Sequence, residues 1–410
     1  MKSNEALIAD TQFSWNTKGV KTMQETMRIA QRCILPPSGP NFAEGASQYP
    51  DLINLTIGDP DLATPSQILE PAFEDARQGH TKYTATKGDP ALREEICRYY
   101  QRAYGLDIAL EEVFVTTAGC IGMTEALLAV IDPGDEVIVP DPYFMIYPDQ
   151  IRMAGGVPVP LPTCWEEGFA LNPQRLESLI TPKTRAILLN TPNNPTGAVY
   201  TKENLEQVAE ICIRHDLVAI CDDIYTGFVY GGSQFVPMIT IEGMRHRTIC
   251  VNSFSKNFVM TGMRVGNLVA PPHVIEAVDY LNGFLMYTAP SISQRAAIYA
   301  LRDAEQITPA IAAEFGRRLE YAAERIGRIP GMSVHKPQGS IYLFPSIRES
   351  GLSSRQAAAL LLEKAHVLTM PGDEFGACGE GYLRIACTQA IPVLEQAFDR
   401  IEQAGLFQKG

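Results

Sequence analysis

The stretch SFSKNFVMTGMRVG, residues 253–266, places a lysine and an arginine eight positions apart among small hydroxyl residues. Lys256 offers a primary amine that can attack a carbonyl carbon, and Arg264 offers a planar cation that suits a phosphate or a carboxylate. Taken singly, each residue would usually be a solvated surface side chain. The chemistry therefore depends on whether neighbouring segments bring both side chains to one ligand.

Several other segments place polar or aromatic residues directly after apolar runs. These segments are Ala118-Gly119-Cys120, Asp141 to Phe144, Asn193-Asn194 and Asp222-Asp223. Each has an ordinary interpretation on its own: Asp222-Asp223 a helix cap, NTPNNPTG at 190–197 a turn, and Phe144 a core residue. Ligands of open parallel sheets bind beyond the carboxyl ends of the strands, so we expect these residues to share one site.

Together, these residue types match the needs of an organic cofactor that carries an aldehyde, a pyridine nitrogen and a phosphate. A lysine amine forms a Schiff base with the aldehyde. A carboxylate keeps the ring nitrogen protonated, so that the ring can withdraw electrons. Arginine, hydroxyl groups and the amides at a helix start hold the phosphate, and an aromatic ring stacks on the cofactor. The segments named above supply each of these groups.

The elements that must position these residues alternate between apolar β-rich runs and amphipathic runs. Predicted strands cover 113–117, 135–140, 157–162, 185–190, 217–223, 248–255 and 265–270. Predicted helices among them include 89–105, 122–131 and 202–216. Strands this apolar, divided by helices, predict an α/β fold with a mostly parallel sheet sandwiched by helices.

After about residue 285 the pattern changes to helices followed by short β-rich runs. Helices are expected over 291–306 and 308–327, and strands in MSVHKP, SIYLFPSI, AHVLTMPG and GYLRIAC. We therefore predict a large ligand-binding domain at 46–285 and a smaller α+β domain at 286–410. Residues 1–45 are expected to form an N-terminal arm that packs with the small domain.

The composition of the 410-residue chain narrows its class. Apolar residues make up 46% and charged residues 20%, which predicts a folded chain of about two domains. A net charge of −13 disfavours a nucleic-acid partner, which usually requires a basic face. Nine scattered cysteines without CxxC pairs indicate reduced thiols and a cytoplasmic protein. The N-terminal MKSNEALIADTQFSW has no long apolar run, so we expect neither a signal peptide nor a membrane partner.

Eight motifs in chain order carry a family resemblance. They are LTIGDPD, YTATKGDPALRE, TTAGC, DPGDEVIVPDPYF, NTPNNPTG, CDDIYTGF, SFSKNFVMTGMRVG and GYLRIAC. In this order the chain resembles the class I/II aminotransferases of the pyridoxal-phosphate-dependent fold type I (aspartate aminotransferase-like) superfamily, from roughly Leu55 to Arg384. The resemblance implies the fold type I large domain, a smaller domain and pyridoxal 5'-phosphate as the cofactor.

The resemblance assigns roles around the cofactor ring. Lys256 matches the Schiff-base lysine, whose freed amine moves a proton at the substrate α-carbon. Asp222 matches the carboxylate at the pyridine nitrogen, and Asp223 follows where the family usually has glutamate. Tyr225 and Asn194 match the residues that hydrogen-bond the ring oxygen, and Asn194 is also assigned to the substrate site.

The resemblance also assigns phosphate contacts. Ser253 and Arg264 match phosphate ligands, with Ser255 as an assisting hydroxyl. Gly119 and Cys120 match the helix start whose backbone amides face the phosphate. A nucleophilic Cys120 is the alternative interpretation, although no histidine lies near it in the sequence.

Four further residues match stacking, partner-subunit and substrate positions. Phe144 matches the ring-stacking aromatic, with Tyr143 as the alternative if the alignment shifts by one. Tyr83 matches a tyrosine that reaches the cofactor phosphate of the other subunit, which implies a homodimer with shared active sites. Arg384 matches the fork that binds the substrate α-carboxylate, and Gly58 a glycine whose backbone approaches it. We assign no metal ligands.

The implied activity is transfer of an amino group from an L-amino acid to a 2-oxo acid, with 2-oxoglutarate as the expected acceptor, by a ping-pong mechanism through Lys256. The main alternative is a carbon–sulfur β-lyase or another eliminating enzyme of the same fold. A ligand-sensing regulator would need a DNA-binding module, for which the N-terminal arm is too short. An α/β enzyme that uses no such cofactor, with a structural Lys256, is the third alternative.

The amino-acid donor is less well defined. Family members that prefer dicarboxylic substrates need a second cation, and one subgroup takes an arginine from the segment that corresponds to NGFLMYTAPS, 282–291. This segment is apolar here, which favours apolar or aromatic substrates. Aspartate stays possible, because other subgroups use different cations.

Overall fold

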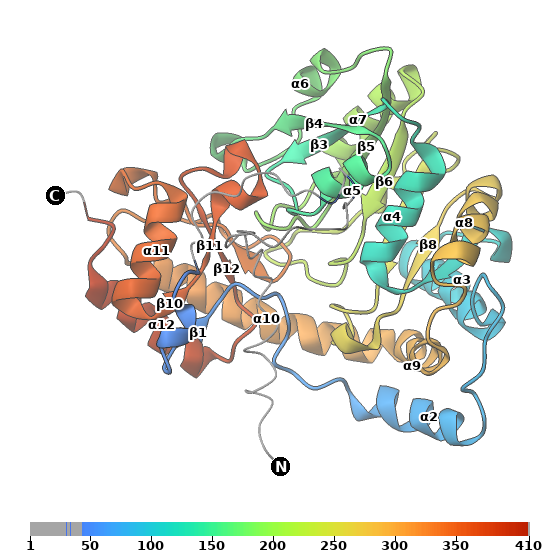
Figure 1. Ribbon diagram of the computed structural model, residues 1–410, viewed down its shortest axis with the longest axis horizontal. Coiled ribbons are helices and arrows are strands. Elements are labelled where there is room, and N and C mark those ends of the chain that lie inside the picture. Colours follow the sequence, from blue (N-terminus) through green and yellow to red (C-terminus); the bar gives the residue numbers. More distant parts are fainter. Residues whose placement is uncertain (1–29, 31–32, 34–42, 409–410) are drawn as a thin grey trace, which may run out of the picture.

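The computed structural model describes Ala30, Cys33 and residues 43–408 (Figure 1). The N-terminal arm predicted for residues 1–45 lies almost entirely outside the described residues. The fold class predicted from the sequence is confirmed: an α/β part with a mostly parallel sheet joins a smaller part built of helices and short strands.

The main sheet has seven strands in the order β2-β8-β7-β6-β5-β3-β4. The strands are β2 (Val113–Thr116), β3 (Glu136–Asp141), β4 (Val157–Pro162), β5 (Thr184–Asn190), β6 (Val218–Asp222), β7 (Thr248–Ser253) and β8 (Gly266–Val269). The pairs from β4 through β7 are parallel, and β8 is antiparallel to both of its neighbours. Each strand falls within two residues of its predicted bounds.

Helices cover both faces of this sheet (Figure 1). They are α3 (Pro90–Tyr104), α4 (Ala118–Val130), α5 (Tyr147–Met153), α6 (Pro173–Ser178), α7 (Lys202–Arg214) and α8 (Pro272–Leu285). Along β3, Val137 and Val139 pack in the core beneath α4, α5 and α8, whereas Ile138 packs in the core beneath α6 and α7. A strand buried on both faces explains why its sequence is apolar without alternation.

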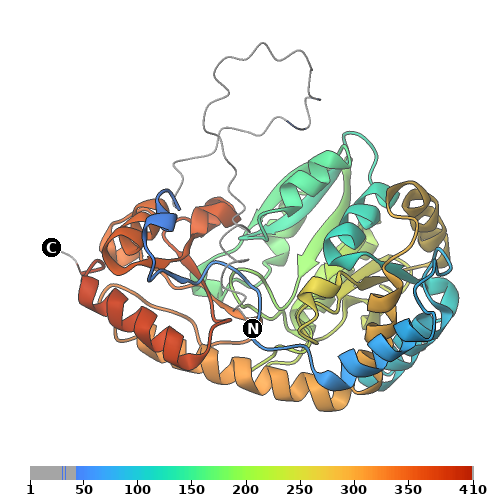
Figure 2. The ribbon, with the colours of Figure 1, turned by 60° about the horizontal axis from the view of Figure 1, so that its bottom comes forward.

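The C-terminal part contains long helices and very short strands. Its elements are α9 (Ser291–Arg302), α10 (Ala304–Ile326), β9 (Tyr342–Leu343), α11 (Ser354–Ala365), β10 (Val367–Leu368), β11 (Met370–Pro371), β12 (Leu383–Ala386) and α12 (Ile391–Ala404). β9, β12 and β11 form an antiparallel sheet in which β12 is central. In Figure 2, α10 runs along the lower edge of the molecule and connects the two parts.

Two sequence predictions for this part are wrong. MSVHKP forms no strand, and Ser333 makes only an isolated bridge to Ser346. The helix expected from residue 308 begins at Ala304 and contains Pro309. The proline removes one backbone donor, but burial of Ile307, Ile311 and Phe315 in the core stabilises the helix through it.

The segment that precedes α2 (Ser66–Arg77) is packed against the C-terminal part. β1 (Ile53–Asn54) pairs in parallel with β10. Beyond it, the Ala386 amide donates to the Leu55 carbonyl (2.8 Å) and the Thr388 hydroxyl to the Ile57 carbonyl (3.0 Å). Residues 55–61 thus lie beside β12, which brings Gly58 and Arg384 from opposite ends of the chain to one place.

The remaining regular elements are short 3-10 turns, and they occur in connections. They are Ala46–Gln48, Leu110–Glu112, Trp165–Glu167, Met238–Thr240, Thr261–Met263, Arg348–Ser350, Gly372–Phe375 and Ala377–Gly379. Over the described ranges, no helix has both the length and the apolar character needed to cross a lipid bilayer.

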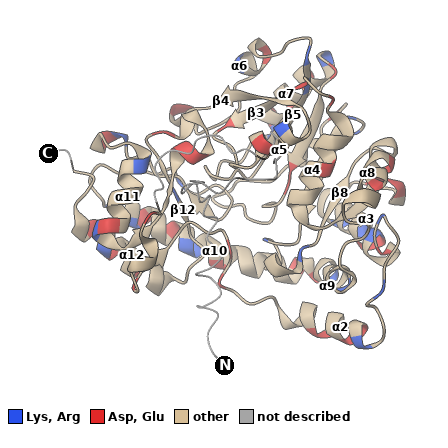
Figure 3. Cartoon of the chain, in the orientation of Figure 1, with Lys and Arg blue, Asp and Glu red and all other residues tan. Residues whose placement is uncertain are grey.

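Arg318 of α10 fixes the 55–61 segment. Its guanidinium donates to the Asp61 carboxylate and to the Thr388 carbonyl, both at 2.7 Å, and to Glu314 at 2.8 Å. Only 3% of the Arg318 side chain is exposed. Acidic and basic residues are interspersed along the outer helices (Figure 3), but most such pairs are solvated and contribute little. The buried Arg318 pairs differ, because losing one partner leaves the others desolvated and unpaired.

We predict that Arg318→Ala lowers the free energy of unfolding by about 2–4 kcal/mol, since the buried Thr388 carbonyl and the Asp61 carboxylate lose their donor. Arg317→Ala is the matched control, because its side chain is 65% exposed and also pairs with Glu314. The measurement is urea unfolding of both variants. Equal midpoints would contradict a specific role for Arg318.

Candidate active site

Polar residues end four neighbouring strands of the main sheet at the same edge. Asp141 ends β3, Asn190 ends β5, Asp222 ends β6 and Ser253 ends β7. Since these strands are parallel, their last residues meet at one edge of the sheet. The predicted strand-end site therefore exists as a physical cluster.

Asp222 is a buried carboxylate with neutral partners. Its side chain accepts a hydrogen bond from the Tyr147 hydroxyl at 2.5 Å and one from the Ile224 amide at 3.2 Å. Only 5% of the residue is exposed, and desolvation raises its pKa to about 6 despite these two bonds. Both partners are uncharged, so a cation placed beside this carboxylate would stabilise its charged form.

Asn190 links Asp222 to Asn194. The Asn190 amide donates to the Asp222 carbonyl at 3.0 Å, and its side-chain oxygen accepts the backbone N–H of Asn194 at 2.8 Å. Asn190 and Asn194 are 3% exposed. The turn NTPNNPTG is thereby fixed to the end of β6, with the Asn194 side chain directed to Arg384.

Lys256 follows β7 and points to the 55–61 segment. Its ammonium donates to the Gly58 carbonyl at 2.5 Å. Gly58 itself has no room for a side chain, because a Cβ there would lie 1.8 Å from the Tyr342 hydroxyl. The family resemblance assigned this glycine to a close backbone approach to the substrate carboxylate, and the Tyr342 hydroxyl is a second group that requires a glycine here.

The start of α4 lies against Ser253. A Cβ on Gly119 would lie 2.8 Å from Ile224 Cδ1 and 3.4 Å from the Ser253 Cβ, so glycine permits this approach. The Ser253 and Ser255 hydroxyls are 2.9 Å apart, and both residues are buried. Unpaired amides at a helix start beside two hydroxyls form a suitable site for an anion.

Cys120 lies close enough to Asp222, Arg264 and Lys256 for their charges to act on its thiol. Burial and the Asp222 charge raise the pKa of the Cys120 thiol, while Arg264 and Lys256 oppose this. A thiol with a raised pKa is a poor nucleophile, which argues against the nucleophilic alternative for Cys120. Arg264 has a left-handed backbone (φ 52°) after the Thr261–Met263 turn and donates to the Thr261 carbonyl at 2.8 Å.

Arg384 on β12 is 5% exposed. Its guanidinium donates to the Asn194 side chain at 3.0 Å and to the Thr56 carbonyl, while its buried Nε has no partner among the described residues. Desolvation lowers its pKa. A buried guanidinium without a carboxylate partner is a suitable receptor for an anion supplied by a ligand.

Phe144 and Tyr143 point to different surroundings. The Phe144 ring packs edge-to-face on Tyr147, with centroids 5.6 Å apart, and Tyr147 in turn bonds Asp222. The Tyr143 amide donates to the Phe375 carbonyl at 2.8 Å, in the junction with the C-terminal part. Of the two, Phe144 is the aromatic residue connected to the Asp222 carboxylate.

Tyr83 stands apart from this cluster in the described contacts. Its side chain is 81% exposed, and its ring lies 5.1 Å from that of Tyr287 in an edge-to-face arrangement. The electrostatic surroundings of Tyr225, by contrast, include Asp222, Arg384 and Tyr342. The predicted ring-oxygen ligands Tyr225 and Asn194 therefore both lie near Arg384 within one chain.

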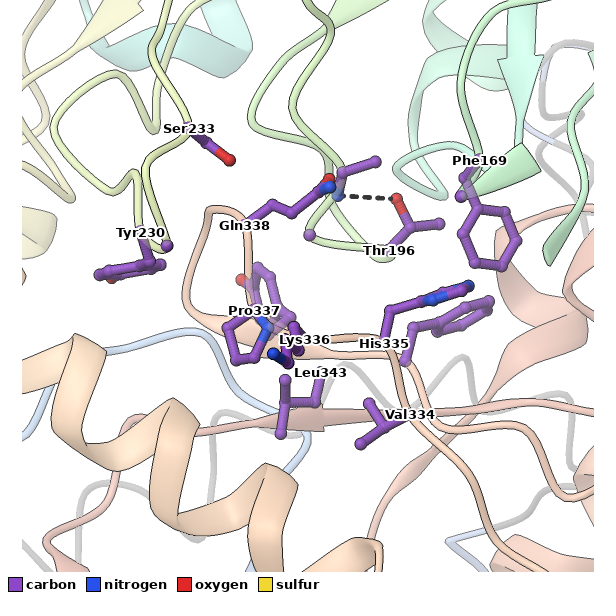
Figure 4. A pocket seen from close by; sticks show the side chains of 16 residues that line it. Phe169, Thr196, Tyr230, Ser233, Val334, His335, Lys336, Pro337, Gln338 and Leu343 are labelled. Carbon is purple, nitrogen blue, oxygen red and sulfur yellow. Dashed lines mark hydrogen bonds between the residues drawn. The ribbon is translucent and has the colours of Figure 1, made fainter. Parts of the chain in front are cut away.

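A cavity of about 390 Å³ adjoins the cluster (Figure 4). It lies between residues 196–198, 230–233 and 334–344, and its lining includes Tyr342 but none of Lys256, Asp222 and Arg384. The Thr196 hydroxyl on its wall accepts the Ala198 amide at 3.2 Å. This cavity is therefore a neighbour of the strand-end cluster and not its centre.

Three residues of the cluster were missed in the sequence analysis. Asn190 lies at the end of a predicted strand, and Tyr342 lies in SIYLFPSI, which was interpreted only as a strand. Tyr147 lies in a segment for which no helix or strand was predicted, although α5 begins there, three residues after Phe144. The place of Tyr342 depends on the pairing of β9 with β12, which no sequence pattern indicated.

The described residues fit pyridoxal phosphate. The Asp222 carboxylate lacks a cation, which a protonated ring nitrogen would supply. The α4 start with Ser253 and Ser255 suits a phosphate, and Lys256, which follows β7, offers an amine. The unpartnered Nε of Arg384 suits the carboxylate of an amino acid.

Comparisons with known proteins agree with this geometry. The family model described as aminotransferase class I and II matches residues 50–401. The chain is 39% identical to an aspartate aminotransferase of Pyrococcus horikoshii over 92% of this chain and 97% of that relative. It is also 39% identical to aromatic-amino-acid aminotransferase 2 of Thermococcus litoralis, over 86% of this chain and 91% of that relative.

Solved structures show the same fold. An aromatic aminotransferase from Pyrococcus horikoshii superposes with a TM-score of 0.84 at 36% identity, covering 88% of this chain and 98% of that one. An aspartate aminotransferase from Thermus thermophilus with maleate superposes with a TM-score of 0.86 at 34% identity, covering 92% and 100%. The chain therefore belongs to the class I and II aminotransferases and is a pyridoxal-phosphate-dependent transaminase of fold type I.

Proposed function

We propose that the enzyme moves the amino group of an L-amino acid to a 2-oxo acid, with 2-oxoglutarate as acceptor, in a ping-pong reaction in which Lys256 holds the cofactor as a Schiff base. The observation that carries this proposal is the buried Asp222 carboxylate, which has neutral partners and a pKa of about 6. Such a carboxylate, at the end of a central strand, suits a protonated pyridine nitrogen.

When bound, pyridoxal phosphate supplies an aldehyde for the amino group and a ring that withdraws electrons from the substrate α-carbon. Lys256 then removes and returns the α-proton, because its amine follows β7 at the strand-end cluster and reaches the Gly58 carbonyl. Tyr225 and Asn194 hydrogen-bond the ring oxygen, and Phe144 stacks on the ring.

The phosphate is assigned to the Gly119 and Cys120 amides together with Ser253, Ser255 and Arg264. The hydroxyl pair at 2.9 Å and the start of α4 support the first four. Arg264 is exposed and bonds Thr261, and its electrostatic influence on Cys120 supports its place at the same end of the site. The interval of eight residues from Lys256 then spans the distance from the aldehyde carbon to the phosphate.

The substrate α-carboxylate is assigned to Arg384, with Asn194 and the Gly58 backbone beside it. The bond between Arg384 and Asn194 and the unpartnered Arg384 Nε support this assignment. The apolar 282–291 segment favours an apolar or aromatic side chain on the donor. The relatives named above include enzymes for aspartate and for aromatic amino acids.

We also propose a cytoplasmic homodimer in which Tyr83 reaches the partner's cofactor phosphate. The C-terminal end of α8 and the turn after it expose a group of large apolar side chains together with Tyr83. The group consists of Tyr83, Tyr280, Phe284, Leu285, Met286 and Tyr287, which are 42–81% exposed. A contiguous apolar surface of this kind supports burial against a second copy, and nine free cysteines support a reducing compartment.

The division into a large domain at 46–285 and a small domain at 286–410 stays a proposal. Pairing of β1 with β10 supports one refinement: residues 46–61 belong with the small domain, although they precede the large one in the chain. The Gly58 carbonyl that accepts Lys256 would then move with the small domain.

We predict that Lys256→Ala lowers turnover by at least about 10⁴-fold, because no other amine replaces the nucleophile and base. The measurement is a panel of aromatic, branched and acidic amino donors against 2-oxoglutarate and pyruvate, with products identified by mass. Wild type should give 2-oxo acids in proportion to new amino acids. Exposed Lys183→Ala is the control, and normal turnover of Lys256→Ala or ammonia release without an acceptor would contradict the proposal.

Asp222 predicts a pH dependence of the cofactor-free protein. Its pKa is raised from 3.8 to about 6, so the folded protein binds the Asp222 proton more tightly than the unfolded chain does. The stabilisation that this proton provides is complete below about pH 4 and is lost as the pH rises through about 6. Between pH 4.5 and 7.5 wild type should therefore lose about 2 kcal/mol relative to Asp222→Asn. Urea unfolding at both pH values measures this. Parallel pH profiles would contradict a charged, uncompensated Asp222.

If the exposed apolar group around the end of α8 forms the dimer interface, a charge introduced there should dissociate the dimer. Phe284→Glu places a carboxylate on a side chain that is 76% exposed in the single chain, so a buried interface should dissociate and the sedimentation coefficient should fall to that of a monomer. Met153→Glu, on a methionine 50% exposed on α5, is the matched control and should stay dimeric. A wild type that sediments as a monomer at micromolar concentration would refute the proposed dimer.

A further inference from the structure

Tyr342 lies outside the motifs found in the sequence, but it contacts several groups of the proposed site. It lies on β9 directly opposite Ala386 of β12. Arg384 is two residues from Ala386 along the same strand, so Tyr342 and Arg384 are diagonal neighbours on one face of the sheet. Strand pairing alone therefore places this tyrosine beside the arginine assigned to the substrate carboxylate.

The ring of Tyr342 supports the guanidinium of Arg384. The Arg384 Cζ lies 4.4 Å from the centroid of the Tyr342 ring and 4.7 Å from that of the Phe375 ring. Aromatic rings attract a guanidinium held over their faces, and the attraction is greatest where water is excluded. Because Arg384 is 5% exposed, these rings restrict where its fork can point.

The hydroxyl of Tyr342 reaches a different group, the Tyr225 hydroxyl. The two oxygens are 3.2 Å apart, and Tyr342 and Tyr225 are 4% and 5% exposed. Gly58 also lies against this hydroxyl, since a Cβ on Gly58 would lie 1.8 Å from it. One side chain thus touches the proposed ring-oxygen donor, the proposed carboxylate receptor and the segment that accepts Lys256.

We propose that Tyr342 is a positioning residue of the active site: its hydroxyl donates to Tyr225, and its ring orients Arg384. A donor that itself accepts a hydrogen bond is polarised and donates more strongly. Tyr225 would then donate its hydroxyl proton to the ring oxygen of the cofactor. The Arg384 guanidinium would be held in one position by the Tyr342 ring. This inference rests on the proposed function, which assigns Tyr225 and Arg384 these roles.

Packing alone does not account for this tyrosine. Ile341 and Leu343 fill the core on either side of it, and a phenylalanine would fill the same volume. Two other buried tyrosine hydroxyls, those of Tyr230 and Tyr382, have no hydrogen-bond partner among the described residues. The Tyr342 hydroxyl, like that of Tyr147, has one, and its partner is the proposed cofactor ligand Tyr225.

The test uses the holoenzyme with three substitutions. Tyr342→Phe removes the hydroxyl and keeps the ring on Arg384, whereas Tyr342→Leu removes both. Tyr382→Phe is the matched control, because it deletes an equally buried hydroxyl from a neighbouring part of the fold. Tyr225→Phe, alone and combined with Tyr342→Phe, reports whether the hydroxyl acts through Tyr225.

Two readouts separate the hydroxyl from the ring. The first is the pH at which the visible absorption of the bound cofactor changes, which is sensitive to hydrogen bonding at the ring oxygen. Asp222 and Arg384 are the charged groups that also act on Tyr225, and neither is changed in these variants. The second is the dissociation constant of 3-phenylpropanoate, which carries a carboxylate but no amino group to react.

Tyr342→Phe should raise the absorption midpoint by about 0.5 to 1 pH unit, since a weaker Tyr225 donor leaves the cofactor protonated to higher pH. Its affinity for 3-phenylpropanoate should change less than about twofold, because the ring stays on Arg384. Tyr342→Leu should shift the midpoint similarly and weaken the carboxylate about tenfold. Tyr382→Phe should change neither, and the shift should vanish in the Tyr225→Phe background.

An absorption midpoint of Tyr342→Phe equal to that of wild type would overturn the inference, as would an equal shift in Tyr382→Phe. A Tyr342→Phe shift that persists without the Tyr225 hydroxyl would also overturn it. These outcomes leave transamination by wild type intact. A wild type that neither absorbs visible light with the added cofactor nor transfers amino groups would instead refute the proposed function, and this inference with it.

Discussion

The site depends on one costly feature, a carboxylate buried at the end of a central strand. Taking the Asp222 charge out of water is unfavourable, and its pKa of about 6 reflects that cost. Tyr147 and the Ile224 amide offset only part of it. The parallel sheet makes the burial possible, because helices cover both faces and strand ends provide fixed polar positions. In the proposed function, a protonated ring nitrogen would supply the cation that Asp222 lacks.

Much of this arrangement could be predicted from the sequence because it is local. Four neighbouring main-sheet strands, β3, β5, β6 and β7, are apolar runs that end in a polar residue. The positions of Asp222, Asn194 and Ser253 therefore follow once these strands are taken as parallel. The order of the motifs then identified the family. Asp222, Lys256 and the start of α4 could be assigned without knowing how distant segments of the chain pair.

What could not be predicted depends on pairing between distant segments. The two-residue strands of the C-terminal part are too short to show a sequence period. The sequence therefore could not predict the pairing that sets Tyr342 beside Arg384, or the pairing of residues 53–54 with 367–368. Pro309 suggested a helix start, but core packing extends α10 through it. Asn190 lies in a strand that was predicted correctly, whereas α5, which begins at Tyr147, was not predicted. The hydrogen bonds that both residues make are tertiary contacts.

The long-range pairings have a consequence for the reaction. Lys256 belongs to the main sheet, but its hydrogen-bond acceptor, the Gly58 carbonyl, lies in a segment fixed to β12 and α10 through Thr388 and Arg318. Arg384, the proposed carboxylate receptor, lies on that same strand. Any movement of the C-terminal part would therefore carry Arg384 and the lysine's acceptor together, relative to the strand ends of the main sheet. In the proposed reaction, this link would keep the substrate α-carbon within reach of the Lys256 amine.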